Sequence, residues 1–150
     1  MGVRAPRSPR LARDRGPLLE RLILDTTVLV AAERSARSLD AVIGDEDDVA
    51  IAAVTAAELL LGVELSEGKN KQRRRAFVDE VLSTIPIEAY DLDVARTHAS
   101  LLAHTRRSGR PRGAHDLLVA ATAITQKRMV VSADPSGFTD LPGLALRHSA

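Results

Sequence analysis

The chain has 150 residues, which favours one domain with its own hydrophobic core. Its composition, 45% hydrophobic and 27% charged with a net charge of +1, is typical of a soluble globular protein. It has no cysteine, which excludes disulfides, cysteine-ligated zinc and a thiol nucleophile. No apolar stretch approaches the ~20 residues of a membrane span, and the N-terminus lacks the apolar core of a secretory signal. We therefore expect a cytoplasmic protein with no membrane partner.

Residues 1–17 contain three prolines and several arginines with no hydrophobic period. This pattern predicts a flexible basic leader, followed by a single folded domain over residues 18–150. Farther along, basic residues gather in KNKQRRR (69–75) and RRSGRPR (106–112), and acidic ones in DEDD (45–48). Such runs could steer a polyanion, although a charged run is more often a solvated surface.

Short apolar runs alternate with longer helical patterns from residue 21 onward. The runs predict strands at 22–25, 49–54, 85–88 and 129–132, with a possible fifth at 144–147. Helices are expected near 27–34, 36–44, 55–66, 70–83, 92–107 and 115–127. Strands separated by helices pair in parallel. The sequence therefore predicts a three-layer α/β/α domain with a mainly parallel central sheet of four or five strands.

Four carboxylates fall at one edge of that predicted sheet. Asp25 ends the first strand, and Glu58 lies in the first turn of the helix that follows the second. Asp134 comes just after the fourth strand, and Asp116 opens the helix that leads into it. Open α/β sheets bind their ligands at this carboxyl edge.

Gathered carboxylates repel one another unless a cation lies between them. Oxygen-only ligation suits a hard ion, Mg²⁺ or Mn²⁺, which could activate water for hydrolysis of a phosphodiester. Each acid also has a plain structural alternative. Asp25 could cap the next helix, Glu58 could form a capping box with Thr55, Asp116 suits a helix dipole, and Asp134 suits a turn. Convergence on one edge favours a metal-dependent phosphotransfer or nuclease site.

The chain from about Leu22 to Arg147 resembles the PIN domain, specifically the VapC-type ribonuclease toxins of bacterial toxin–antitoxin pairs. The similar segments, in order, are LILDTTVLVAAE, VTAAELLLGVE, LDVARTHASLLAHTRRSGRPRGAHDLLVAATAI and VVSADPSGFTDLPGLAL. Two positions depart from the family. The residue before the phenylalanine of the last segment, usually aspartate, is Gly137, and the residue two after the first aspartate is Thr27.

The resemblance implies a Mg²⁺-dependent endoribonuclease, with Mn²⁺ able to substitute, whose metal is held by acids matching Asp25, Glu58, Asp116 and Asp134. It also implies a cognate VapB-like antitoxin that occludes the cleft, and toxin homodimers in a larger toxin–antitoxin assembly. RNA is the implied substrate.

Several other side chains are candidates beside the acids. Arg110 and Arg112 precede the acidic helix and could grip substrate phosphates, although a solvated turn is as good an interpretation. Thr26 could offer a hydroxyl to the substrate, whereas for Thr27 we favour helix capping. His115 is next to Asp116, but helix neighbours point about 100° apart, so we expect a partly exposed packing residue.

Two other classes of function stay open. A phosphoaspartyl receiver or phosphatase also has an aspartate at the end of its first strand. The phosphatase motif needs a second aspartate where Thr27 stands, and residues 132–146 lack the lysine of a receiver. A catalytically dead RNA-binding module is the third possibility, and the retained acids argue against it.

Overall fold

The computed structural model describes residues 20–37, 39–44 and 48–149. A five-stranded sheet forms the centre, with the strands in the order β3-β2-β1-β4-β5, and all pairs are parallel. The strands are β1 (Arg21–Leu24), β2 (Asp48–Ala52), β3 (Ile87–Glu88), β4 (Met129–Ser132) and β5 (Leu146–His148). This confirms the predicted parallel α/β sheet. The predicted leader and residues 45–47 of the acidic run lie outside the described residues.

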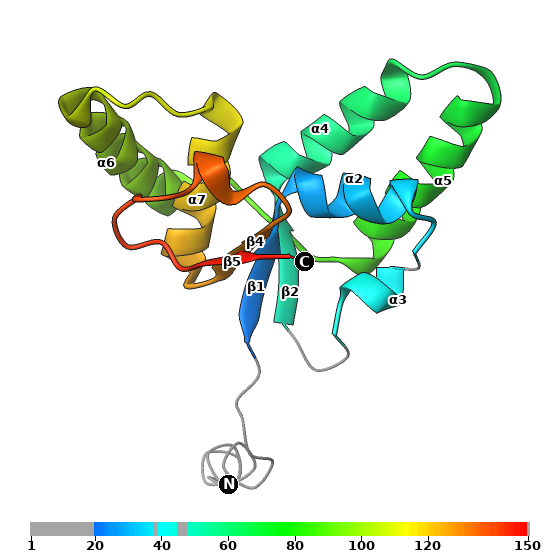
Figure 1. Ribbon diagram of the computed structural model, residues 1–150, viewed down its shortest axis with the longest axis horizontal. Coiled ribbons are helices and arrows are strands. Elements are labelled where there is room, and N and C mark those ends of the chain that lie inside the picture. The colour runs from blue at the N-terminus through cyan, green and yellow to red at the C-terminus, as the bar shows by residue number, and fades with distance from the viewer. Residues whose placement is uncertain (1–19, 38, 45–47, 150) are drawn as a thin grey trace, which may run out of the picture.

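Helices cover both faces of the sheet, which gives the three layers seen in Figure 1. On one side lie α2 (Thr26–Arg34), α3 (Leu39–Val42), α4 (Ala53–Glu64) and α5 (Gly68–Thr84). On the other lie α6 (Leu92–Ser108) and α7 (Ala114–Gln126), with a 3-10 turn, η1 (Pro135–Gly137), after β4. The helix expected over 36–44 is reduced to α3, because Ala36 has a φ of 55° and ends helical geometry there.

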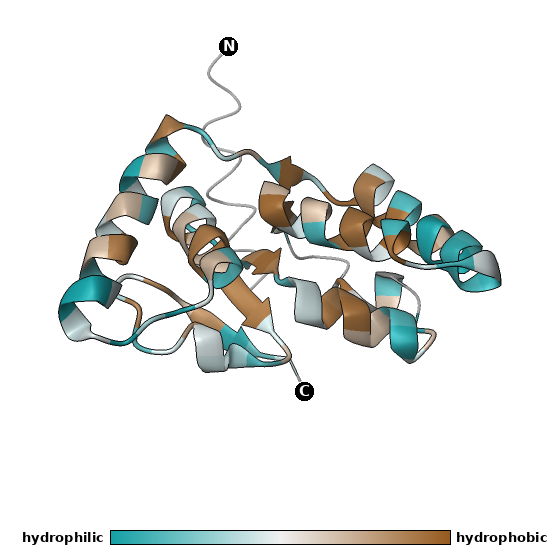
Figure 2. Ribbon diagram, turned by 90° about the horizontal axis from the view of Figure 1, so that it is seen from above, coloured by the Kyte–Doolittle hydropathy of each residue, from teal (hydrophilic) through white to brown (hydrophobic). Residues whose placement is uncertain are grey.

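Strand alternation divides the hydrophobic core into two halves. Leu22 and Leu24 of β1 pack with helices α2, α4 and α5, whereas Ile23 between them packs with α6 and α7. Successive strand side chains point to opposite faces, so this near-continuous apolar strand serves both layers. The central strands are accordingly mostly brown in Figure 2, and the far end of the α4–α5 pair is teal. No helix in the described part of the chain is long and apolar enough to cross a membrane.

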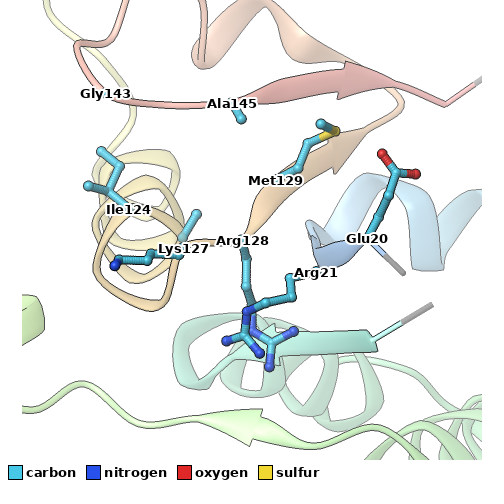
Figure 3. Close-up of a pocket in the computed structure, with 9 residues that line it drawn as sticks. Glu20, Arg21, Ile124, Lys127, Arg128, Met129, Gly143 and Ala145 are labelled. Atoms are coloured by element: carbon cyan, nitrogen blue, oxygen red, sulfur yellow. The ribbon is translucent and has the colours of Figure 1, made fainter. Parts of the chain in front are cut away.

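Arg128 holds the amino edge of the sheet together. Only 8% of this residue is exposed, and its guanidinium donates to the backbone oxygens of Leu22 (3.1 Å) and Asp48 (3.0 Å). It also forms ion pairs with the carboxylates of Glu88 (2.8 Å) and Asp48 (3.0 Å). Arg21, beside it in Figure 3, pairs with the other oxygen of Asp48 at 2.7 Å. One buried cation therefore links β1, β2 and β3.

Replacing Arg128 by Ala should reduce the free energy of unfolding by about 2–4 kcal/mol, because it leaves the partly buried carboxylate of Glu88 without its partner and removes a donor from two backbone oxygens. Arg147→Ala is the matched control, since the Arg147–Glu20 pair has exposed partners (44% and 48%). That change should cost less than about 1 kcal/mol. Urea denaturation measures both, and equal losses would contradict the structural role given to Arg128.

Candidate active site

Asp25 is buried at the carboxyl edge of the sheet, directly after β1, with 5% of the residue exposed. It is the N-cap of α2, since its Oδ1 accepts from the backbone N–H of Val28 at 3.3 Å. The structural alternative of a helix cap is therefore confirmed. The carboxylate has further partners, however, because Thr27 donates to Oδ1 at 2.5 Å and Ser132 donates to Oδ2 at 2.6 Å. The side chain is held in one orientation by three donors.

Two hydroxyls tie this carboxylate to the end of β4. Thr27 Oγ1 accepts from the backbone N–H of Ala133 at 2.9 Å, and Ser132 Oγ accepts from that of Asp134 at 3.1 Å. The predicted capping role of Thr27 is wrong, because Asp25 is the cap and Thr27 bridges α2 to the segment after β4. Ser132 is fully buried. Sequence analysis missed it, although a polar residue that ends an apolar strand was an available signal.

Glu58 reaches the same edge from the second turn of α4. Its Oε1 accepts from Thr26 Oγ1 at 2.6 Å, and its Oε2 lies 2.7 Å from Nδ1 of His115. The predicted capping box is wrong, because α4 starts at Ala53, straight from β2, with Ala52 as its N-cap. Thr55 is consequently inside the helix, where its buried Oγ1 has no hydrogen-bond partner in the described structure.

His115 is not the packing residue that the sequence suggested. Its side chain is 55% exposed and points its Nδ1 at Glu58, a residue 57 positions away in the chain. The expectation of a packing residue rested only on the angle between neighbours on one helix. That angle could not show that α4 brings the carboxylate of Glu58 to His115. Thr26 and His115 together hold both oxygens of Glu58.

Asp116 lies in the first turn of α7, as predicted, and faces the other three acids. Partial burial raises the pKa of its carboxyl above the ordinary value, and the charges of Asp25, Glu58 and Asp134 raise it further, with His115 opposing them. An open hollow of about 370 Å³ next to this carboxylate is lined by residues 113–116. The charges of the other three predicted acids thus each act on Asp116, beside a hollow that is open to solvent.

Gly137 packs directly against the Asp116 carboxylate. A Cβ at position 137 would lie 2.1 Å from Oδ2 of Asp116, far inside van der Waals contact. The departure from the family pattern at this position therefore has a physical consequence, because no side chain fits here while Asp116 keeps its orientation. The negative charge after β4 comes from Asp134 instead.

Asp134 is exposed and caps the short turn η1. Its Oδ1 accepts from the hydroxyl of Ser136 at 2.9 Å and from the same residue's N–H at 3.4 Å. The turn alternative is thus confirmed for this residue, while its charge still contributes to the raised pKa of Asp116. In the described residues, no three acidic or histidine side chains already converge on one metal position.

The two predicted phosphate-binding arginines differ in their surroundings. Arg110 is exposed and forms a 3.5 Å pair with Asp140. Arg112 has a buried NH1 atom without a hydrogen-bond partner in the described structure. Burying an N–H donor without an acceptor costs free energy, so we expect Arg112 NH1 to donate to a bound group.

A cavity of about 460 Å³ lies at the opposite edge of the sheet and is drawn in Figure 3. It does not compete as a metal centre, because Glu20 is the one carboxylate in its lining and pairs with Arg147.

The parallel three-layer fold with acids at the carboxyl edge of its sheet agrees with comparisons to known proteins. The family model described as "PIN domain" matches residues 22–144. The chain therefore belongs to the PIN-domain family and, within it, to the VapC-type proteins.

Individual relatives support this placement. Ribonuclease VapC5 of Mycobacterium tuberculosis is 36% identical over 126 residues, which span 82% of this chain and 89% of the relative. Ribonuclease VapC of Rickettsia bellii is 29% identical over 124 residues, 82% of this chain and 92% of that protein. Among solved structures, VapBC2 of Rickettsia felis, bound to a promoter DNA fragment, superposes with a TM-score of 0.76 at 25% identity. That match covers 87% of this chain and 99% of the other.

Asp116→Asn should stabilise the metal-free protein at neutral pH. The pKa of Asp116 is raised on folding, so its contribution to stability is present below the unfolded-state pKa and is lost as pH rises through the folded-state value. The gain should be no more than about 1 kcal/mol for a partly exposed group, and it should vanish below about pH 3, where both states are largely protonated.

Urea denaturation in EDTA at both pH values measures this difference. Asp79→Asn serves as the control, because Asp79 is an exposed acid on α5, a helix that carries none of the four acids. This change should alter the free energy of unfolding equally little at both pH values. A destabilised Asp116→Asn protein at neutral pH would contradict the repulsion.

Proposed function

We propose that this chain is a metal-dependent endoribonuclease that acts as the toxin of a toxin–antitoxin pair. The observation that carries the proposal is Asp116, whose carboxyl has a pKa raised first by burial and then by the charges of Asp25, Glu58 and Asp134. Carboxylates gathered at one edge of a sheet repel one another, and a cation bound between them would relieve that repulsion. Relatives named ribonuclease VapC supply the substrate class.

The donor set fits a divalent cation of the Mg²⁺ type, with Mn²⁺ as a substitute. All of the candidate ligands are carboxylate oxygens, which such hard ions prefer, and Mg²⁺ commonly keeps several waters while binding only one or two carboxylates. Asp25 and Asp116 would hold the ion, with Glu58 and Asp134 as direct or water-bridged ligands. When bound, the ion would lower the pKa of a water molecule and neutralise charge on the phosphoryl group.

The protein's own groups would orient the acids and the substrate. Ser132 and Thr27 fix the carboxylate of Asp25, while Thr26 and His115 fix that of Glu58. This assigns Thr26 a role through Glu58, in place of the direct substrate contact expected from the sequence. Arg112, whose NH1 has no hydrogen-bond partner among the described residues, would donate to a phosphate of the RNA, and Arg110 would do so after release from Asp140.

A phosphoaspartyl mechanism is less well supported. The nucleophile of such a mechanism would be Asp25, which follows β1 directly. The position two residues later, where the phosphatase motif has an acid, is Thr27, and its hydroxyl is already bonded to Asp25 and Ala133.

Asp25→Asn and Asp116→Asn should reduce RNA cleavage by at least about 100-fold, since even the partners of metal ligands cost 10- to 100-fold when changed. Asparagine still caps a helix, so Asp25→Asn should keep α2 intact. Cleavage of a labelled RNA is measured with Mg²⁺, with Mn²⁺ and with excess EDTA, which should abolish it. Asp79→Asn is the control of equal charge change and should cut at the original rate.

Cleavage that persists in EDTA would contradict metal dependence. A fully active Asp25→Asn protein would leave that residue with its capping role alone. Circular dichroism on each variant separates loss of chemistry from loss of fold.

The second half of the proposal is an inhibitory protein partner. VapBC2 of Rickettsia felis is bound to a DNA fragment from its promoter, and VapBC-5 of Mycobacterium tuberculosis is a member of the VapBC family of toxin–antitoxin systems. A cleft lined by carboxylates invites a cationic side chain in place of the metal, and arginine pairs with carboxylates through two parallel hydrogen bonds. We expect homodimers of this chain within such an assembly.

The cognate antitoxin should therefore place an arginine or lysine of its C-terminal half against Asp25 and Asp116, and the complex should be inactive and depleted of metal. A crystal structure of the pair, with metal content measured on the same preparation, tests this. An inactive complex whose acidic cleft holds no partner side chain would show that inhibition acts elsewhere, for example by blocking the approach of RNA.

A further inference from the structure

A basic cleft lies between the end of α2 and the first half of α5, away from the acidic edge. Its lining includes Arg34, Arg37, Arg73, Arg74, Glu33 and Phe77, and its volume is about 520 Å³. It contains part of the KNKQRRR run, which has no role in the site described above. Phe77 is partly buried against the core and forms apolar lining, with the cationic groups around it.

Most of the positive charge in this cleft is not neutralised. Arg74 pairs with Glu33 at 3.3 Å, which uses the one carboxylate of the lining. Arg73 donates to Asn70, and Arg37 donates to a backbone oxygen at 3.4 Å. Within the described part of the chain, no carboxylate forms an ion pair with Arg34, Arg37 or Arg73. Three exposed guanidinium groups are thus available to an anion.

Helix α2 connects this cleft to the acidic edge. The helix begins beside its cap Asp25 and ends at Arg34, so its 9 residues separate the two by about 13 Å at 1.5 Å per residue. A nucleic-acid strand with one phosphate at Asp25 and Asp116 would reach the cleft within a few nucleotides. Its regularly spaced phosphates match spaced guanidinium groups better than the single charge of a small anion does.

We propose that the α2–α5 cleft binds the sugar-phosphate backbone of single-stranded RNA next to the bond that is cut. This inference rests on the proposed function. The cleft would offset the repulsion that RNA meets at four carboxylates, and it would contribute affinity without reading bases, because the contacts are to phosphates. Arg34, Arg37 and Arg73 are then substrate-binding residues outside the acidic site.

RNA binding measured without cleavage tests the cleft separately from the chemistry. The full chain carrying Asp116→Asn is titrated in EDTA against a fluorescein-labelled single-stranded RNA, and the anisotropy gives the dissociation constant at several salt concentrations. Adding Arg34→Gln with Arg73→Gln should weaken binding at least tenfold at ~0.1 M salt and reduce the slope of log K against log salt by about 1.4, from two lost phosphate contacts.

Arg96→Gln with Lys127→Gln is the matched control, because both residues are exposed, lie on other elements and form no ion pair in the described structure. The same net charge is removed, so the control should lose less than about threefold in affinity. Arg34→Lys with Arg73→Lys keeps the charge and should bind within a few-fold of the parent. This third variant supplies the comparison if the glutamine pair folds poorly.

Equal losses in the glutamine pair and the control would overturn the proposal, because net charge alone would then explain binding. A double variant Arg34→Gln, Arg73→Gln that binds RNA like its parent would also overturn the proposal. If that variant failed to bind the antitoxin, the cleft would be a protein-binding surface. Absence of cleavage by the unmodified chain in Mg²⁺ would count against the proposed function and not against the cleft.

Discussion

The mutual repulsion of carboxylates around Asp116 is the constraint on which the functional half of this molecule depends. Parallel pairing brings the ends of β1 and β4 together, and α4 and α7 add Glu58 and Asp116 at the same edge. Burial of Asp116 raises the pKa of its carboxyl most, and the charges of the other three acids raise that pKa further, which expresses the cost of this arrangement. The fold tolerates that cost because the surrounding hydroxyls, N–H groups and imidazole hold the acids in place, and a bound cation would remove it.

Those supporting groups come from three separate segments, α2, β4 and α7. Asp25 is held by Thr27 and by Ser132 of β4, and Glu58 is held by Thr26 of α2 and His115 of α7. Asp25 and Glu58 are therefore oriented in part by contacts that exist only once the sheet and both helical layers have assembled. This couples the geometry of the edge to the stability of the whole domain, including the Arg128 contacts at the opposite edge.

The sequence was sufficient to predict the parallel sheet because its strands are apolar, short and separated by strongly periodic helices. The strand at 129–132 has the predicted bounds, and 92–107 differs from α6 by one residue. The prediction of a capping box at Thr55 was wrong because the local sequence pattern does not show that α4 begins directly after β2, with no loop between them. The hydrogen bonds of His115 and Ser132 were not predictable, since their partners are 57 and 107 positions distant in the chain.

The most direct test of the central claim is the pKa of the Asp116 carboxyl, measured by NMR through its side-chain carbon with and without Mg²⁺. We predict a value above that of an ordinary aspartate in the metal-free protein and a clear fall when Mg²⁺ is added, because the cation reverses the local potential. A pKa that stays the same in saturating Mg²⁺ would contradict the account, since no ion would then lie among these four carboxylates.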